Sequence, residues 1–210
     1  MTLRVTEVFR SLQGEGLQQG TPMAFVRLTG CPLRCSWCDT TYSFRGGTTL
    51  SERQVLSAVR SLGCSWVSLT GGEPLAQDLN VLTELLLGEG FRIHLETGGS
   101  EPLAALRTHP QVHIAMDLKC PSSGMAGRNL LANLGLLKVT DEVKFVIGDS
   151  ADLAFVRGLL SRHPLPCSGV LQPVFGAPLG STLKQAQEDP LPLLYRVQLH
   201  KHLYGQRAGT

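Results

Sequence analysis

The chain has 210 residues, of which 42% are hydrophobic and 17% are charged, as is usual for a globular protein with one sizeable core. A formal net charge of +2, with no run of Lys or Arg, excludes a broad basic surface for nucleic acid or for an anionic membrane. No apolar run reaches about 18 residues, and Arg4, Glu7 and Arg10 interrupt the amino terminus, so we expect one cytoplasmic domain over residues 1–210 without a signal or membrane segment.

The first predicted elements lead the chain into a cysteine-rich loop. Residues 2–12 alternate between apolar and polar side chains, which predicts a strand at the edge of a sheet. A polar, glycine-rich loop follows at residues 11–16. Residues 23–29 are mostly apolar except for Arg27, which predicts the first buried strand. That strand runs directly into Gly30–Thr40, with the sequence GCPLRCSWCDT.

Beyond this loop, strand and helix patterns alternate. Ser51 followed by Gln54 is the signature of a capping box for a helix that ends near Leu62. Pro74 is expected to begin a second helix, which carries a leucine stripe at positions 79, 82, 85 and 86. Further strands are predicted at residues 65–70, 91–96, 112–118, 142–147 and 169–175, and further helices at 103–107, before Lys138 and at 151–162.

This order implies a parallel sheet with right-handed crossovers. About six strand–helix units fall short of the eight that close a TIM barrel, so we predict an α/β fold with a partial (β/α)6 barrel, open on one side. Residues 195–199 are expected to add a terminal strand, and Leu203 to Thr210 to form a loose tail. The alternative is a doubly wound sheet, which would favour GxGxxG after the first strand, and that motif is absent.

Three of the six cysteines, Cys31, Cys35 and Cys38, lie within eight residues in the spacing CxxxCxxC. On a loop, this spacing lets three thiolates converge on one metal centre and leaves one coordination position open, as in a [4Fe–4S] cluster with one free iron. In a reducing compartment, metal binding is also more common than disulfide formation.

A structural zinc site is the alternative, completed by a histidine or by Cys64, Cys120 or Cys167. A zinc nucleobase deaminase is excluded. Its HxE motif precedes a Pro-Cys-x-x-Cys motif, whereas here HxE follows the cysteines and Arg34 takes the place of the proline.

Polar residues follow nearly every predicted strand, and the carboxyl ends of parallel strands converge on one mouth of a barrel. Thr70-Gly71-Gly72-Glu73-Pro74 is the clearest case. Its two glycines let the backbone approach a ligand closely, so that amides and carbonyls can hold an amino-acid ammonium and carboxylate.

The cysteine loop followed one strand–helix unit later by Gly-Gly-Glu resembles the radical S-adenosylmethionine (SAM) superfamily. Further motifs are similar to the 7-carboxy-7-deazaguanine synthase family and span almost the whole chain. They are residues 11–16 (SLQGEG), 25–28 (FVRL), 38–40 (CDT), 117–119 (DLK), 171–173 (LQP) and 199–201 (LHK).

This resemblance implies conversion of 6-carboxy-5,6,7,8-tetrahydropterin to 7-carboxy-7-deazaguanine with loss of ammonia, on the route to 7-deazapurine nucleosides such as queuosine. It implies a [4Fe–4S] cluster on Cys31, Cys35 and Cys38, and SAM as a true cofactor. It implies Mg²⁺ at Thr40. It also implies substrate contacts from Leu12, Gln13, Gly14, Glu15, Arg27 and Thr70, and SAM contacts from Trp37, Cys38, Asp39, Gly72, Lys119, Ser122 and Gln172.

Several of these residues suit such roles by their own chemistry. Arg27 offers a bidentate fork for a carboxylate, and Gln13 and Glu15 offer groups that suit the polar edge of a pterin. Threonine alone is a poor Mg²⁺ ligand, so the ion at Thr40 would bind together with substrate oxygens and water. Glu96 is left as a substrate ligand or a loop cap, and His200 is expected to pack rather than to catalyse.

We expect a flavodoxin or ferredoxin as the electron donor, a homodimer, and no direct contact with nucleic acid or membrane. Two other functions remain open at this stage. One is an activase that generates a glycyl radical on a protein partner, and the other is a non-catalytic module stabilised by zinc.

Overall fold

The computed structural model describes residues 2–103, 109–177, 180–205, 207 and 209. Within these residues, nine strands form one sheet in the order β3-β1-β2-β4-β5-β6-β7-β8-β9. The strands are β1 (Thr2–Leu12), β2 (Pro22–Leu28), β3 (Thr48–Ser51), β4 (Trp66–Gly71), β5 (Arg92–Thr97), β6 (Val112–Asp117), β7 (Glu142–Ile147), β8 (Ser168–Pro173) and β9 (Leu194–Tyr195). The α-helices are α1 (Glu52–Ser61), α2 (Asn80–Gly88), α3 (Ser150–Arg162), α4 (Gly180–Glu188) and α5 (Leu199–Tyr204).

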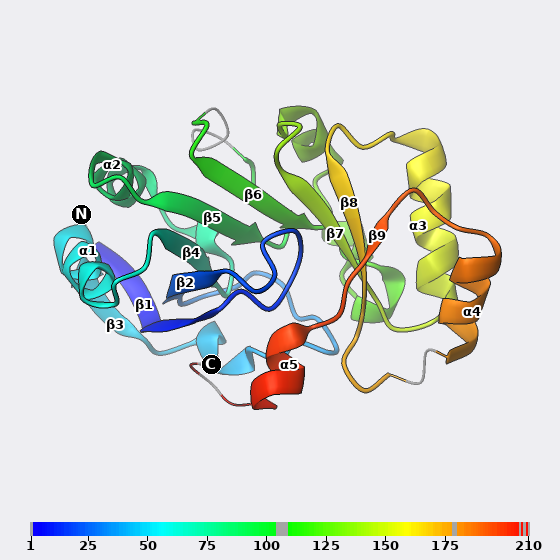
Figure 1. Ribbon diagram of the computed structural model, residues 1–210, viewed down its shortest axis with the longest axis horizontal. Coiled ribbons are helices and arrows are strands. Elements are labelled where there is room, and N and C mark those ends of the chain that lie inside the picture. Colours follow the sequence, from blue (N-terminus) through cyan, green and yellow to red (C-terminus); the bar gives the residue numbers. More distant parts are fainter. Residues whose placement is uncertain (1, 104–108, 178–179, 206, 208, 210) are drawn as a thin grey trace.

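β2 and β4 to β9 pair with their neighbours in parallel, and β1 pairs antiparallel with both β2 and β3. β2 and β4 to β8 are the six strands of the predicted partial barrel, which is confirmed. Their order never reverses, so the sheet lacks the switch point of a doubly wound fold. In Figure 1, α1 and α2 lie toward the end of the sheet that carries β1, and α3 and α4 lie toward the end that carries β8 and β9.

The strands alternate between two environments, as β5 illustrates. Ile93 and Leu95 are fully buried in a core that includes Leu82 and Leu86 of α2. The intervening residues His94 and Glu96 belong to the opposite face of the strand, because side chains alternate with period two. The inner face of the sheet therefore carries polar groups, and its outer face packs against the helices.

The capping box of α1 is confirmed. Ser51 Oγ accepts from the Gln54 backbone N–H at 3.3 Å, and Gln54 Oε1 accepts from the Ser51 N–H at 2.8 Å. The prediction that residues 2–12 form the edge strand is wrong, because β3 pairs with the outer side of β1. β3 has only four residues and shows no apolar alternation, so no strand is predicted there from the sequence.

Other boundaries also differ from expectation. Pro74 begins a single 3-10 turn (Pro74–Ala76), which the Glu73 carboxylate caps and which ends because Gln77 is extended, so α2 begins only at Asn80. The weak helix expected before Lys138 is a 3-10 segment at Leu131–Leu136. The helix expected at residues 103–107 lies almost entirely outside the described residues.

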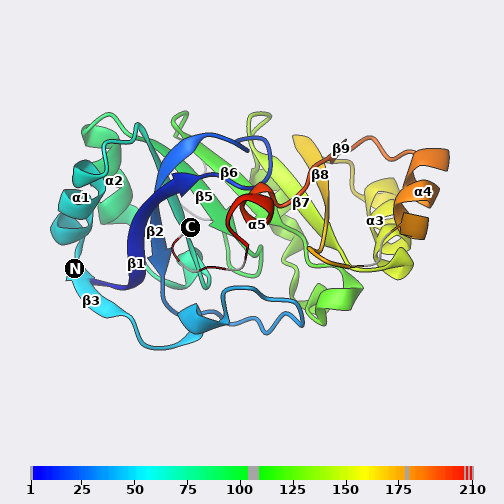
Figure 2. The ribbon, with the colours of Figure 1, turned by 60° about the horizontal axis from the view of Figure 1, so that its bottom comes forward.

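The carboxyl-terminal segment is more structured than expected. The terminal strand is limited to β9, and Leu199 begins α5, so Leu203 belongs to a helix and not to a loose tail. α4 was not predicted from the sequence. Figure 2 shows α5 in front of the strands, between β1 and β7. Among the described residues, no helix has the length and apolarity needed to cross a membrane.

Candidate active site

A cavity of about 420 Å³ opens at the carboxyl ends of the parallel strands. It brings together most of the site residues predicted from the sequence, although they are far apart along the chain. Those lining it are Leu12, Gln13, Gly14, Glu15, Arg27, Cys31, Cys35, Trp37, Cys38, Asp39, Thr40, Thr70, Gly72 and Lys119. Ser122 and Gln172 are not brought to its surface.

The cysteine loop presents three thiols to the cavity. Cys31, Cys35 and Cys38 are free and partly buried, and all three line it. Among the described residues, none of the other three cysteines, Cys64, Cys120 and Cys167, lines the cavity. Three thiolates without a fourth cysteine suit a [4Fe–4S] cluster that keeps one iron open better than they suit a four-cysteine zinc site.

The thiols of Cys31 and Cys35 are protonated until a metal binds. Burial raises the pKa of Cys31, and it also raises the pKa of Cys35, so both sulfurs are protonated at neutral pH without a metal. The Leu33 N–H points to Cys31 Sγ at 3.4 Å and is placed to stabilise a thiolate there. Cluster binding would release the thiol protons, because only thiolates act as ligands.

The loop after β4 presses against the cysteine loop and forms part of the cavity wall. The Glu73 N–H donates to Gly30 O at 2.7 Å, and a Cβ added at Gly72 would lie 1.9 Å from that same oxygen. Gly71 has a positive φ of 128°. Only glycine permits this close approach of the two loops, and Gly71 and Gly72 both line the cavity.

Glu73 does not itself face the cavity. Its carboxylate is fully buried and accepts hydrogen bonds from Leu75 N–H, Thr97 Oγ1 and Gly98 N–H. Burial raises the pKa of Glu73, whereas these donors oppose that rise. The carboxylate therefore joins the loops after β4 and β5, and only the two glycines of Gly-Gly-Glu line the cavity.

Several predicted SAM residues lie near the cluster loop. Trp37 Nε1 donates to Ser122 Oγ at 3.3 Å, and Lys119 Nζ lies 5.8 Å from the centre of the Trp37 ring. Gln172 is fully buried, and among the described residues neither polar atom of its amide has a hydrogen-bond partner. Such an orphaned buried amide has the chemistry expected of a group that awaits a ligand.

The residues predicted to bind substrate form two groups that are connected by hydrogen bonds and ion pairs. In the first, Gln13 Nε2 donates to Glu96 Oε1 at 2.8 Å, and Thr70 Oγ1 donates to Glu96 Oε2 at 2.6 Å. Glu96 is therefore a bridge between two predicted substrate residues and not a cap for Gly98.

The second group is a chain of alternating charges. Lys144 Nζ lies 2.7 Å from Glu15 Oε2 and 3.2 Å from Asp117 Oδ1, and Asp117 Oδ2 lies 2.9 Å from Lys119 Nζ. Gln198 Nε2 also donates to Glu15 at 2.8 Å. Burial alone would raise the pKa of Glu15, but Lys144 overrides it and lowers the pKa to about 2. Glu15 is thus a fixed carboxylate at neutral pH.

Arg27 lines the cavity with one side of its guanidinium already paired. Its Nε donates to Glu7 Oε1 at 2.7 Å, and Tyr42 OH donates to the same oxygen at 2.8 Å. Burial raises the pKa of Tyr42 to about 12, so the phenol remains a donor. Within the described chain, the two terminal nitrogens of Arg27 make no hydrogen bond, so they are available to a carboxylate.

The end of the cluster loop contacts the carboxyl-terminal helix. Asp39 Oδ2 lies 2.7 Å from Lys201 Nζ, and Thr40 Oγ1 donates to Asp39 Oδ1 at 2.8 Å. Burial opposes ionisation of Asp39, but hydrogen bonds from His200, Lys201 and Thr40 lower its pKa. His200 also packs against Gly14, where a Cβ would overlap its ring. This contact agrees with the packing role expected for His200.

Sequence reasoning missed several residues of the cavity. Lys144 had a weak signal, since a lysine within the apolar strand 142–147 needs a buried partner. Gln198 had none, because its segment was expected to be a strand, and Lys201 appeared only as the last residue of the LHK motif, without a predicted role. Tyr42 gave no signal, since its partner Glu7 lies 35 positions away.

Comparisons with known proteins identify the family of this chain. Residues 25–139 match the family model described as the radical SAM superfamily. The chain is 37% identical to the 7-carboxy-7-deazaguanine synthase of Koribacter versatilis, over 96% of this chain and 97% of that protein, and 35% identical to that of Thermoplasma acidophilum, over 98% and 99%. It also resembles the crystal structure of QueE from Escherichia coli, with a TM-score of 0.78, 26% identity and 95% coverage of both chains. The chain therefore belongs to the 7-carboxy-7-deazaguanine synthase family of the radical SAM superfamily.

Proposed function

We propose that the enzyme converts 6-carboxy-5,6,7,8-tetrahydropterin to 7-carboxy-7-deazaguanine, with release of ammonia, within one catalytic domain over residues 1–210. The observation that carries this proposal is a single cavity that holds the three cysteines together with Arg27, Glu15 and the Gln13–Glu96 pair. Its volume of about 420 Å³ suits a small molecule better than a glycine in a protein partner, which argues against an activase.

The cluster and SAM would bind at the end of the cavity formed by the cysteine loop and Gly72. When bound, they supply abstraction of a hydrogen atom from a substrate carbon. Trp37 and Lys119 would pack beside SAM, and the orphaned amide of Gln172 would gain a partner there after a small movement of the strand end. The half-buried wall of the cavity would keep water from the reactive species.

The chain's own side chains would bind and orient the pterin. Arg27 would hold its carboxylate through the two terminal nitrogens, while Glu7 keeps the guanidinium in place. Glu15, held ionised by Lys144, would accept hydrogen bonds from the polar edge of the ring. Thr40 would contribute one oxygen to a Mg²⁺ ion whose remaining ligands are substrate oxygens and water.

The remaining proposals concern partners. Leu194 and Tyr195 of the terminal strand β9 are exposed at the edge of the sheet, which supports a homodimer formed through that edge. The small net charge supports a function without nucleic acid or membrane, in the cytoplasm. A flavodoxin or ferredoxin is the proposed electron donor.

Anaerobic reconstitution followed by assay tests this proposal. We expect about four irons and four sulfides per chain, Mg²⁺-stimulated formation of 7-carboxy-7-deazaguanine from the carboxytetrahydropterin, and no net loss of SAM. Arg27→Gln is expected to raise KM for the pterin about tenfold or more, by loss of a charge-assisted pair. Arg162→Gln, on the exposed face of α3, is the matched control. Formation of 5′-deoxyadenosine without the deazaguanine would contradict the substrate and leave the radical chemistry intact.

A further inference from the structure

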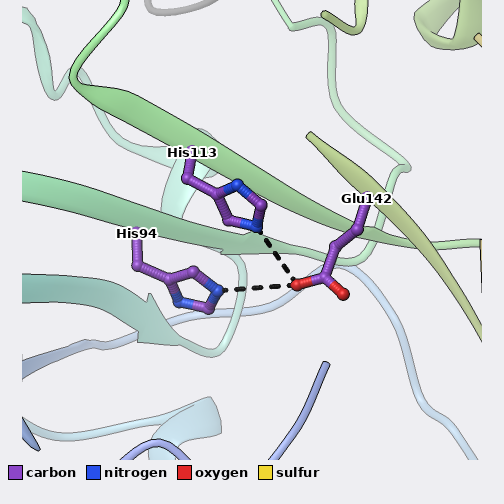
Figure 3. Close-up of side chains that lie close together, drawn as sticks. All are labelled: His94, His113 and Glu142. Carbon is purple, nitrogen blue, oxygen red and sulfur yellow. Dashed lines mark hydrogen bonds and ion pairs between the residues drawn. The ribbon is translucent and has the colours of Figure 1, made fainter. Parts of the chain in front are cut away.

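A buried cluster of two histidines and a carboxylate lies inside the barrel, apart from the residues that line the cavity. His94 of β5 and His113 of β6 stack with their ring centres 5.4 Å apart, and both point toward Glu142 of β7 (Figure 3). His113 Nε2 lies 3.2 Å from Glu142 Oε1, and His94 Nε2 lies 3.9 Å from that oxygen. Their side chains are 8%, 1% and 0% exposed for His113, His94 and Glu142, so this is an interior feature.

The cluster contacts the loop at residues 13–17 at both of its ends. Gln13 Nε2 lies 3.1 Å from His94 Nδ1, and the Leu17 N–H donates to Glu142 Oε2 at 2.8 Å. Between them, Gly16 has a φ of 65°, and a Cβ there would lie 2.4 Å from Glu142. The loop that carries the proposed substrate residues therefore rests directly on the cluster.

The hydrogen bonds around Gln13 fix the direction of its amide. Its Oε1 accepts from the Glu15 N–H at 3.0 Å, and its Nε2 donates to Glu96 Oε1 at 2.8 Å. A flipped amide would place two acceptors against each other at Glu96 and two donors at Glu15. The second hydrogen of Nε2 is thus left for His94, so His94 Nδ1 must be the unprotonated nitrogen.

This assignment determines the rest of the His94 ring. Ser68 Oγ lies within hydrogen-bond distance of the same Nδ1, at 3.4 Å, and its hydroxyl can donate to an unprotonated nitrogen there, whereas Glu96 Oε1 at 3.8 Å is too far away to accept a proton from it. The proton of neutral His94 is therefore on Nε2, which faces Glu142. Burial alone would raise the pKa of Glu142, but its histidine neighbours and the charge of Lys144 lower it to about 2, so an anion lies 3.9 Å from that nitrogen.

A metal ion is the competing explanation, because the ligand atoms of His94, His113 and Glu142 all lie within 4.8 Å of one another. To bind a metal, His94 would present the lone pair of Nε2 and carry its proton on Nδ1. That proton would point at the amide hydrogens of Gln13 at 3.1 Å. The arrangement around Gln13 thus favours a proton on Nε2 over a metal.

We propose that His94, supported by Glu142, is a positioning residue that locks the amide of Gln13 so that one lone pair of Oε1 remains for a donor on the substrate. Both hydrogens of Nε2 are engaged by His94 and Glu96, and one lone pair of Oε1 is engaged by Glu15. Gln13 therefore presents an acceptor only, and it selects a ring edge that carries N–H groups. This inference rests on the proposed substrate role of Gln13.

Two variants of His94 separate an acceptor at Nδ1 from mere bulk. In His94→Asn, the amide oxygen falls near the former place of Nδ1, whereas in His94→Gln the polar end of the side chain falls near that of Nε2. We expect His94→Gln to raise KM for the carboxytetrahydropterin about tenfold, the equivalent of one hydrogen bond, with kcat within about threefold. His94→Asn should restore KM to within about threefold of wild type.

A double-mutant cycle with Gln13→Ala tests whether His94 acts through Gln13. Once Gln13 is replaced, His94→Gln should cause no further rise in KM. Additive effects, or equal losses in the two His94 variants, would overturn the proposal. If Gln13→Ala leaves KM unchanged, both this inference and the substrate role of Gln13 are wrong. If Gln13→Ala raises KM and His94→Gln does not, this inference alone is wrong.

Two measurements cover the cases in which a variant folds poorly or the group of His94, His113 and Glu142 holds a metal. Nitrogen-15 NMR of histidine-labelled, cluster-loaded wild type should show His94 as the neutral Nε2–H tautomer without any substitution; a protonated or metal-shifted Nδ1 would overturn the proposal. Metal analysis should find no zinc or additional iron beyond the cluster content. One further equivalent of metal that is lost in His94→Gln would assign the cluster to a metal instead.

Discussion

The three cysteines of the cluster loop lie within eight residues, whereas Glu15 and Lys144 of the charged network are 129 positions apart. The loop is held by local chain geometry and by the close approach of Gly72 to Gly30. The network exists only after β6, β7 and the loop following β1 have come together. One region is therefore encoded by a contiguous motif and the other by the topology of the whole barrel.

This difference predicts how each region fails. A cluster held by three ligands has no redundancy, so loss of one ligand should abolish chemistry without unfolding the domain. In the network, each charge contributes to the fold and to the substrate site together, because an unpaired buried charge destabilises the protein strongly. Substitutions in the two regions should accordingly separate activity from stability.

Cys38→Ala is expected to have the largest effect. Removal of one of three ligands should reduce iron in the reconstituted protein to well below about four per chain, and 5′-deoxyadenosine formation to below detection. The free energy of unfolding of the metal-free protein should change by about 1 kcal/mol or less, since Cys38 is only partly buried. Iron content and 5′-deoxyadenosine are measured after anaerobic reconstitution.

Cys64→Ala is the matched control for this prediction. Cys64 is buried in the core and does not line the cavity, so its removal should leave iron content and activity unchanged. Equal loss of iron in both variants would show that the loop is not the cluster site.

Lys144→Met should have the next largest effect and should act on stability and on substrate binding together. It leaves Glu15 and Asp117 facing each other in a buried site without the ammonium that joins them. We expect the free energy of unfolding to fall by about 3 to 5 kcal/mol, the usual cost of breaking a buried pair, and KM for the pterin to rise. Urea denaturation and steady-state kinetics measure the two effects.

Lys184→Met is the control for the loss of a lysine. Lys184 is 75% exposed and lies 3.8 Å from Glu188 on α4, so its removal should cost about 0.5 kcal/mol or less. A cost below about 1 kcal/mol for Lys144→Met would mean that the network does not contribute as a set of paired charges.

The same contrast explains what the sequence predicted and what it missed. The motif at Gly30–Thr40, the glycines before Glu73 and the alternation of strands and helices are local patterns, and they led to the partial barrel and to most of the cavity. The partners of Lys144 and Arg27 depend on strand register across the sheet, which no single segment encodes.

Errors at the carboxyl terminus have a related cause. Residues 194–204 form a two-residue strand and a six-residue helix that are stabilised by contacts with the rest of the molecule, such as Lys201 with Asp39, and not by periodicity. Short elements of this kind carry too few residues to show a pattern. Gln198 thus entered the site without a sequence signal, and Lys201 entered it only as part of the LHK motif, without a predicted partner.

Acid titration should show the smallest effect, and it tests whether the charged network fixes the state of Glu15. The pKa of Glu15 falls from 4.5 to about 2 on folding, so the unfolded chain binds a proton first as the pH falls. Stability from this group is present above pH 4.5 and is lost between pH 4.5 and about 2. The full difference is at most about 3.4 kcal/mol, of which about 1.4 kcal/mol is lost between pH 7 and about pH 3.5. Urea denaturation of metal-free wild type and Glu15→Gln should therefore give curves of stability against pH that converge as the pH falls to about 3.5, because the variant lacks this acid-sensitive contribution.

The control is Glu188→Gln, which removes an exposed carboxylate of α4 and should give a curve parallel to wild type over the same range. Parallel curves for Glu15→Gln as well would show that Lys144 does not hold Glu15 ionised, and the network would then be a feature of packing and not of charge.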